Sequence, residues 1–319
     1  MTASPKVDVA VNIFAKPYQT SLSVLSLLRA CDKHIDRIYL QFEAYGSTFD
    51  GVPPYVIADY LGDRAVVRQP KYWLKREAPQ LDRLSDSEYR HSIRYQYAFE
   101  NTDKNFLFIM HNDVLIKKDI IGSMLEKIDG AFAIGQLGQC WNCPAKDGPS
   151  VAAAGLGDTP CTPDRYREFQ PDAASLARLY TIARDNGVFV RPYDEDWEKQ
   201  YSQSGWPLPE CRVSEWSCLV DIAQTRALTW PDGPVTAFGA FEQCGTGCLD
   251  TAVAWFRQLN RHGLFARHIN IEPYMTHWVG TGKKSEYKYS QAEGNARSIL
   301  QKSFAPYVTW CKKQGNGLF

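Results

Sequence analysis

The feature that most constrains the fold is an apolar run, Phe106 to Met110, that ends abruptly in His111, Asn112 and Asp113. An unbroken apolar run bounded by polar residues is typical of a strand buried on both faces of a parallel sheet. In open sheets of this kind, ligands lie at the carboxyl ends of the strands. We therefore expect a central strand whose polar tail projects into a ligand site.

Predicted strands and helices alternate through the first 130 residues. This order favours an α/β fold with a mostly parallel, Rossmann-like sheet flanked by helices. The first helix is expected to be capped by Thr20 or Ser21. The predicted strands are 7–14, 37–43, 64–69 and 106–110, and the predicted helices are 23–32, 85–103 and 117–129.

The second half has a less regular pattern. One more strand is predicted there, followed by a loop rich in proline, glycine and aspartate, a helix, a glycine turn that leads into an amphipathic helix, and a strand-like run. We find no internal repeat and no obvious linker, so we expect a single domain over residues 1–319. In order, these segments are 130–139, 144–170, 171–187, 245–263 and 268–278.

Composition excludes several classes of protein. The charges of the 36 basic and 36 acidic residues cancel, so the protein has no net positive charge that would attract nucleic acid. No segment approaches the roughly 20 apolar residues of a transmembrane helix, and the N-terminus lacks the regions of a signal peptide. We expect a cytoplasmic protein whose nine cysteines are mostly thiols.

Cys140 and Cys143 have the spacing of a zinc-ligand pair, but a second pair is missing, and ordinary buried thiols are the favoured interpretation.

The tail of the apolar run allows two interpretations from its residues alone. A turn after Met110 could bring His111 and Asp113 together as ligands of a divalent cation. Alternatively, Asp113 could simply cap the helix that follows.

Four sequence segments resemble, in their order and spacing, those of the A-type-fold (GT-A) glycosyltransferases, in particular the family-two-like group that uses nucleotide-sugar donors. The resemblance covers about the first 140 residues well and the rest loosely. The four segments are VDVAVNIFAKPYQTSLSVLSLL, RIYLQFEAYGS, RAVVRQP and HSIRYQYAFENTDKNFLFIMHNDVLIKKDIIGSMLEKI.

The resemblance implies a metal site that holds Mn²⁺ or Mg²⁺ on the donor diphosphate. Asp113 takes the place of the second acid of the Asp-x-Asp motif, and His111 stands where the first is expected. The late His277, followed by a glycine turn, is the candidate for completing the site. Since imidazole replaces one carboxylate, we expect the site to hold Mg²⁺ more weakly.

The resemblance also implies donor-binding and catalytic residues. Glu43 and Arg94 match positions that contact the nucleoside and the donor phosphate or base. Asp250, near the start of the amphipathic helix, is the first candidate for the base that deprotonates the acceptor hydroxyl, and Glu242 is the second. The remaining candidates for donor binding are Asn112 and Lys283.

Taken together, these features predict a glycosyltransferase (EC 2.4 class) that moves a sugar, with inversion, from a nucleoside-diphosphate donor to a hydroxyl of a glycan or lipid-linked glycan. The expected setting is bacterial surface-polysaccharide assembly, with peripheral membrane association left open. The alternatives are a nucleotidyltransferase and a non-catalytic nucleotide- or glycan-binding module. The expected division is 1–139 for the nucleotide-sugar half, 140–290 for the acceptor and catalytic half, and 291–319 for a C-terminal tail.

Overall fold

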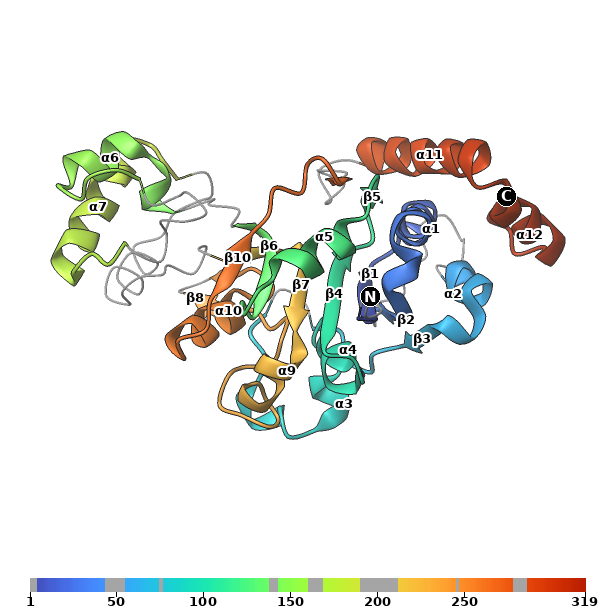
Figure 1. Ribbon diagram of the computed structural model, residues 1–319, viewed down its shortest axis with the longest axis horizontal. Coiled ribbons are helices and arrows are strands. Elements are labelled where there is room, and N and C mark those ends of the chain that lie inside the picture. The colour runs from blue at the N-terminus through green and yellow to red at the C-terminus, as the bar shows by residue number, and fades with distance from the viewer. Residues whose placement is uncertain are drawn as a thin grey trace.

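A seven-stranded sheet forms the centre of the molecule, in the order β10-β6-β7-β4-β1-β2-β3 (Figure 1). The computed structural model describes residues 5–43, 55–74, 77–137, 143–159, 169–189, 212–244, 247–277 and 286–319. The strands of the sheet are β1 (Val7–Ile13), β2 (Ile35–Phe42), β3 (Ala65–Arg68), β4 (Phe106–His111), β6 (Ala133–Leu137), β7 (Val213–Asp221) and β10 (Ala266–His268). Every pairing is parallel except those of β7, which runs antiparallel to both β4 and β6.

Helices flank this sheet, and two strand pairs stand outside it. The helices are α1 (Pro17–Cys31), α2 (Val56–Leu61), α3 (Ser87–Arg90), α4 (Gln96–Asn101), α5 (Ile120–Lys127), α6 (Gly148–Ala153), α7 (Ala173–Asp185), α9 (Ile222–Thr225), α10 (Val253–Arg261), α11 (Glu286–Ser303) and α12 (Ala305–Gln314). The two pairs are β5 (Val114–Ile116) with β11 (Met275–His277), and β8 (Glu242–Cys244) with β9 (Gly247–Leu249). The predicted mostly parallel sheet flanked by helices is confirmed.

The central strand β4 is buried on both faces, as its apolar run predicts. Phe108 and Met110 belong to the core that contains α1, α2 and α5, whereas Leu107 and Ile109 belong to the core that contains α4 and α10. Successive side chains of a strand point to opposite faces, so an uninterrupted apolar run fills both cores at once. The strand therefore gives a rigid support to the polar residues that follow it.

Three predicted elements differ from the structure. Helix α1 begins at Pro17 and has no side-chain cap of its own, so the predicted caps at Thr20 and Ser21 are wrong. The single helix expected over 85–103 is divided into α3 and α4 by Tyr95, whose φ of 65° is left-handed. Part of the loop expected over 144–170 is helical, because α6 lies within it and packs against α7.

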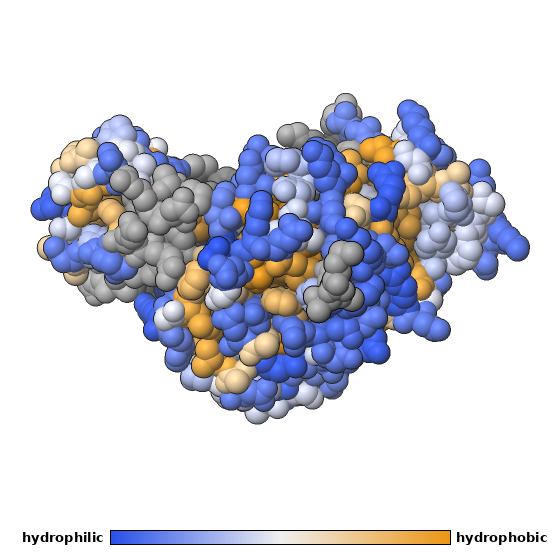
Figure 2. Space-filling model, in the orientation of Figure 1, coloured by the Kyte–Doolittle hydropathy of each residue, from blue (hydrophilic) through white to orange (hydrophobic). Residues whose placement is uncertain are grey.

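The helices α6 and α7 stand apart from the sheet at one end of the molecule, and α11 and α12 lie at the other end (Figure 1). Most of residues 291–319, expected as a tail, belong to α11 and α12, and α11 packs on α1. Most of the face in Figure 2 is hydrophilic, with hydrophobic residues showing in small patches. Within the described ranges, we find no helix with the length and hydropathy to span a bilayer.

Candidate active site

Asp113 lies just beyond the carboxyl end of β4 and is nearly buried, with 7% of its surface exposed. Its Oδ2 lies 2.7 Å from Lys16 Nζ, and its Oδ1 lies 3.1 Å from His277 Nε2. Burial by itself raises the pKa of this carboxyl. The hydrogen bond from His277 and the charge of Lys16 outweigh it and hold the pKa well below the ordinary range. Asp113 is therefore an anion at neutral pH.

Strand pairing brings His277 to this carboxylate across 164 residues of sequence. β11 pairs antiparallel with β5, and His277 lies opposite Val114, the residue after Asp113. The ring of Trp216, on β7, stacks on His277 with centroids 4.5 Å apart and 9° between the planes. Both the backbone and the imidazole of His277 are thus fixed by neighbouring elements.

His111, Asp113 and His277 form a cluster with the geometry of a metal site. One ligand atom from each lies within 4.8 Å of the others. Two imidazoles and one carboxylate suit Mn²⁺ and other transition metals better than Mg²⁺, which prefers oxygen ligands. The alternative that Asp113 caps the next helix does not apply, because Asp119 caps α5 by accepting from the backbone N–H of Gly122.

Glu215 is a residue of this site that the sequence reasoning missed. It lies on β7, fully buried, with Oε1 3.8 Å from His111 Nε2 and Oε2 2.6 Å from Arg212. Burial raises the pKa of Glu215, but Arg212 and His111 outweigh it and lower the pKa to about 2. An ionised carboxylate behind His111 favours a proton on Nε2, which leaves Nδ1 to face Asp113, 3.9 Å away. The alternating segment VSEWSCLVD marks a strand, but its pairing beside β4 is not readable from the residues.

A second polar cluster joins Glu43 and Arg94, 51 residues apart in sequence. Glu43 follows β2, and its Oε1 accepts hydrogen bonds from Arg94 at 2.7 Å and from Asn12 at 3.0 Å. Arg94 also donates to Thr251 at 3.3 Å. Burial tends to lower the pKa of Arg94, whereas Glu43 and, to a smaller extent, Asp250 raise it. The structure thus brings together Glu43, predicted to contact the nucleoside, and Arg94, predicted to contact the donor phosphate or base, and places Asp250 within electrostatic reach of Arg94.

Gly239 approaches the backbone of Arg94 so closely that no side chain fits. Its φ is +87°, and an added Cβ would lie 1.9 Å from the Arg94 carbonyl oxygen. Gly263 has a similar φ of +81° but open space around it. A side chain added at either glycine would strain the left-handed backbone, but only one added at Gly239 would also collide with a neighbour. Comparing substitutions at the two positions therefore separates the cost of the strain from the cost of the collision.

We expect Gly239→Ala to lower the free energy of unfolding by at least about 3 kcal/mol, since backbone must move to relieve the contact. Gly263→Ala is the matched control, and we expect it to cost about 1 kcal/mol from its left-handed backbone alone. Urea unfolding of both variants measures the difference. Equal losses in the two variants would show that the close approach contributes nothing.

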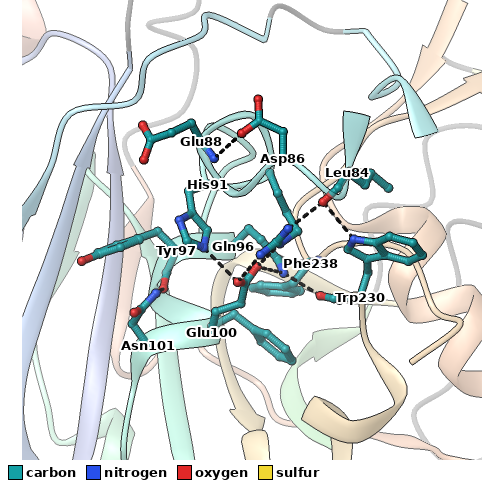
Figure 3. Close-up of polar contacts among 12 residues, drawn as sticks. Leu84, Asp86, Glu88, His91, Gln96, Tyr97, Glu100, Asn101, Trp230 and Phe238 are labelled. Carbon is teal, nitrogen blue, oxygen red and sulfur yellow. Dashed lines mark hydrogen bonds and ion pairs between the residues drawn. The ribbon is translucent and has the colours of Figure 1, made fainter. Parts of the chain in front are cut away.

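A partly buried charge network joins the short helices α3 and α4 (Figure 3). Glu100, on α4, accepts from Arg90 at 2.7 and 3.0 Å, from His91 at 2.8 Å and from Gln96 at 2.7 Å. Burial raises the pKa of Glu100, but the hydrogen bonds from His91 and Arg90 outweigh it and lower the pKa to about 2. Gln96 and Arg90 extend the network to the backbones of Trp230 and Leu84.

The stability contributed by Glu100 is expected to depend on pH. Its pKa is lowered from 4.5 to about 2, so this contribution is complete above pH 4.5 and is lost as the pH falls towards 2. The shift corresponds to about 3 kcal/mol. We expect the difference in free energy of unfolding between wild type and Glu100→Gln to be large at pH 7 and to shrink between pH 5 and pH 2. A constant difference in urea unfolding across that interval contradicts the assignment.

The two candidates for the catalytic base have different environments. Asp250 lies just before α10, and its Oδ1 accepts from the backbone N–H of Thr251 at 2.9 Å. Glu242 forms an ion pair with Arg257. Burial raises the pKa of Glu242 despite the lowering effect of Arg257. Both carboxylates thus have polar partners, and Asp250 remains our first candidate because it lies just before the amphipathic helix α10.

The other predicted residues lie elsewhere. Asn112 donates to the carbonyl of Ala15 at 3.2 Å and to the hydroxyl of Thr20 at 2.9 Å, so in this structure it supports the turn between β1 and α1. Cys143 is buried. Lys283 and Cys140 lie outside the described residues, so their predicted roles in donor and zinc binding stay predictions.

No protein-family model matches this chain, and no curated protein sequence matches it. Its structure is similar to that of the mannosyltransferase PcManGT from Pyrobaculum calidifontis in complex with GDP-Man and Mn²⁺, with a TM-score of 0.47 and 11% identity over 99% of this chain and 85% of that chain. For glucosyl-3-phosphoglycerate synthase from Mycobacterium tuberculosis, in complex with Mn²⁺, UDP and phosphoglyceric acid, the TM-score is 0.42 at 11% identity over 94% and 79%. For S. aureus TarS with UDP-GlcNAc, the TM-score is 0.29 at 11% identity over 41% and 33%, so this chain spans about a third of that one. The first of these solved structures is named a mannosyltransferase, but likenesses this distant assign this chain neither a family nor an activity.

Proposed function

We propose that this chain is a glycosyltransferase that uses a nucleoside-diphosphate sugar and a divalent cation. One observation carries the proposal: two polar clusters, His111–Asp113–His277 and Glu43–Arg94, lie at the carboxyl ends of β4 and β2, which run parallel to β1 between them. A cation site beside a nucleoside site is the arrangement that a bound diphosphate requires. Lys16, beside Asp113, adds a positive charge where the diphosphate would lie.

Each cluster has its own role in this proposal. His111, Asp113 and His277 would hold Mn²⁺, and the bound ion would supply positive charge to the departing diphosphate. Glu43 and Arg94 fix the nucleoside end of the donor. This division leaves the acceptor hydroxyl to a separate base.

Asp250 is the proposed base, and it takes the proton of the acceptor hydroxyl as that oxygen attacks the anomeric carbon with inversion. Its place in the chain supports this role, because the next residue, Thr251, accepts a hydrogen bond at 3.3 Å from Arg94 of the donor cluster. We propose a glycan or lipid-linked glycan as the acceptor, in cytoplasmic assembly of a bacterial surface polysaccharide.

A thermal-shift screen tests the donor site. GDP and UDP are added with and without Mn²⁺. A ligand that binds only the folded state stabilises it, by about 3 kcal/mol at a hundredfold excess over Kd, and so raises the Tm. We expect at least one nucleotide to raise the Tm more in the presence of Mn²⁺. If no nucleoside diphosphate shifts the Tm under either condition, the proposal fails. Binding without turnover across a panel of sugar donors would instead indicate a non-catalytic module.

A further inference from the structure

Asp113 already has a cation beside it, supplied by the chain itself. Lys16 Nζ lies 2.7 Å from Asp113 Oδ2, and only 15% and 10% of the two side chains are exposed. The other carboxylate oxygen, Oδ1, faces the imidazoles of His277 and His111. The lysine thus neutralises the same carboxylate that is proposed to bind Mn²⁺.

The turn that carries Lys16 has an unfavourable backbone conformation. Ala15 and Lys16 have φ values of 52° and 60°, in the left-handed region that residues other than glycine rarely adopt. Two successive residues in this region cost about 1–2 kcal/mol each. Such a conformation persists only where the surroundings hold it in place.

Helix α11, far away in sequence, holds this turn. Glu293 is 4% exposed, and its carboxylate accepts from the backbone N–H of Tyr18 at 2.9 Å and of Gln19 at 3.0 Å. The hydroxyl of Tyr289 accepts from the backbone N–H of Lys16 at 3.1 Å. The N-terminal donors of α1, which lacks a side-chain cap of its own, are thus satisfied from another helix.

We propose that Lys16 is an exchangeable counter-ion of Asp113, positioned by α11. Without a divalent cation, the ammonium group neutralises Asp113. A bound cation takes over that role and repels the ammonium, which then turns towards the donor diphosphate. Tyr289 and Glu293 keep the backbone of Lys16 fixed, so the exchange moves only the side chain. The inference rests on the proposed function for the identity of the ligands.

Mn²⁺ binding without nucleotide tests the exchange separately from sugar transfer. We expect Lys16→Met to bind Mn²⁺ about tenfold more tightly than wild type, because the competing charge is gone. GDP or UDP, whichever raises the wild-type Tm, should bind this variant about tenfold more weakly in saturating Mn²⁺. Lys16→Arg retains the charge and should stay near the wild-type Mn²⁺ affinity. The electron paramagnetic resonance signal of unbound Mn²⁺ gives the affinity, and circular dichroism checks the fold.

The outcomes separate the two proposals. If wild type binds no Mn²⁺, the cation site of the proposed function fails. If wild type binds Mn²⁺ and Lys16→Met binds it equally or more weakly, the counter-ion role of Lys16 is overturned while the cation site stands.

A double-mutant cycle tests the role of α11. Because Glu293→Gln loosens the turn, we expect it to tighten Mn²⁺ binding about threefold in wild type and to have no effect in the Lys16→Met background. Ser21→Ala is the control, since Ser21 joins α1 to Tyr307 of α12 by a 2.8 Å hydrogen bond that does not involve Lys16. It should lower the Tm and leave the Mn²⁺ affinity unchanged. An equal effect of Glu293→Gln in both backgrounds would show that Glu293 does not act through Lys16.

Discussion

Asp113→Asn is expected to abolish the Mn²⁺-dependent rise in Tm on adding nucleotide and to lower sugar transfer by at least about a hundredfold. Asparagine retains the shape of the side chain but removes the charge that His111 and His277 cannot supply as neutral ligands. It also leaves Lys16 without its carboxylate partner, 2.7 Å away in wild type. The variant therefore loses the cation site and gains an uncompensated positive charge in the same place.

The matched control is Asp119→Asn, the same chemical change six residues along the chain. Asp119 caps α5 through the backbone N–H of Gly122, and asparagine is about as good a cap as aspartate. Thermal shift with and without Mn²⁺, and transfer from the donor that binds, should remain close to wild type in this control. If Asp113→Asn retains the Mn²⁺-dependent shift, Asp113 is not a metal ligand.

The sequence points to His111 and Asp113 of the proposed cation site because these two residues depend on local structure. The apolar run of β4 predicts a buried strand, and its polar tail marks the carboxyl end of that strand. His111 and Asp113 are therefore predicted from a single segment. In the same way, Glu43 is recognisable as the acid that follows β2, whereas Arg94 is indicated only by the resemblance, as the arginine of the helical segment before β4.

What the sequence does not reveal depends on contacts between distant segments. β7 joins the sheet antiparallel between β4 and β6 and brings Glu215 behind His111. The alternating pattern of a strand does not specify which strand will pair beside it, and neither does a charged residue within the strand. The cap of α1 shows the same limit, since Glu293 supplies it from a helix 274 residues away. Thr20 and Ser21 are good capping residues, but the tertiary contact decides where the helix begins.

His277 is an intermediate case. The resemblance points to a late histidine, while the structure supplies the reason for its position, which is the pairing of β11 with β5 next to Asp113. The stacked ring of Trp216 completes its support. A lone histidine carries no such information, so the physical case for His277 rests on the strand register.

Asp250→Asn is expected to lower the rate of sugar transfer without weakening donor binding. The Tm rise with nucleotide and Mn²⁺ should match wild type, because the proposed cation site is formed by His111, Asp113 and His277. Sugar transfer should fall by about 10²–10⁴-fold, the usual contribution of a positioned general base. An amide at this position cannot accept the proton of the acceptor hydroxyl, although it retains the size of the carboxylate.

Glu242→Gln is the comparison that decides between the two candidate bases. Glu242 pairs with Arg257, so this variant should lose stability, seen as a lower Tm, and retain most of its transfer rate. Initial rates at saturating donor compare wild type with the two variants. The opposite pattern, with transfer lost in Glu242→Gln and retained in Asp250→Asn, would assign the base to Glu242.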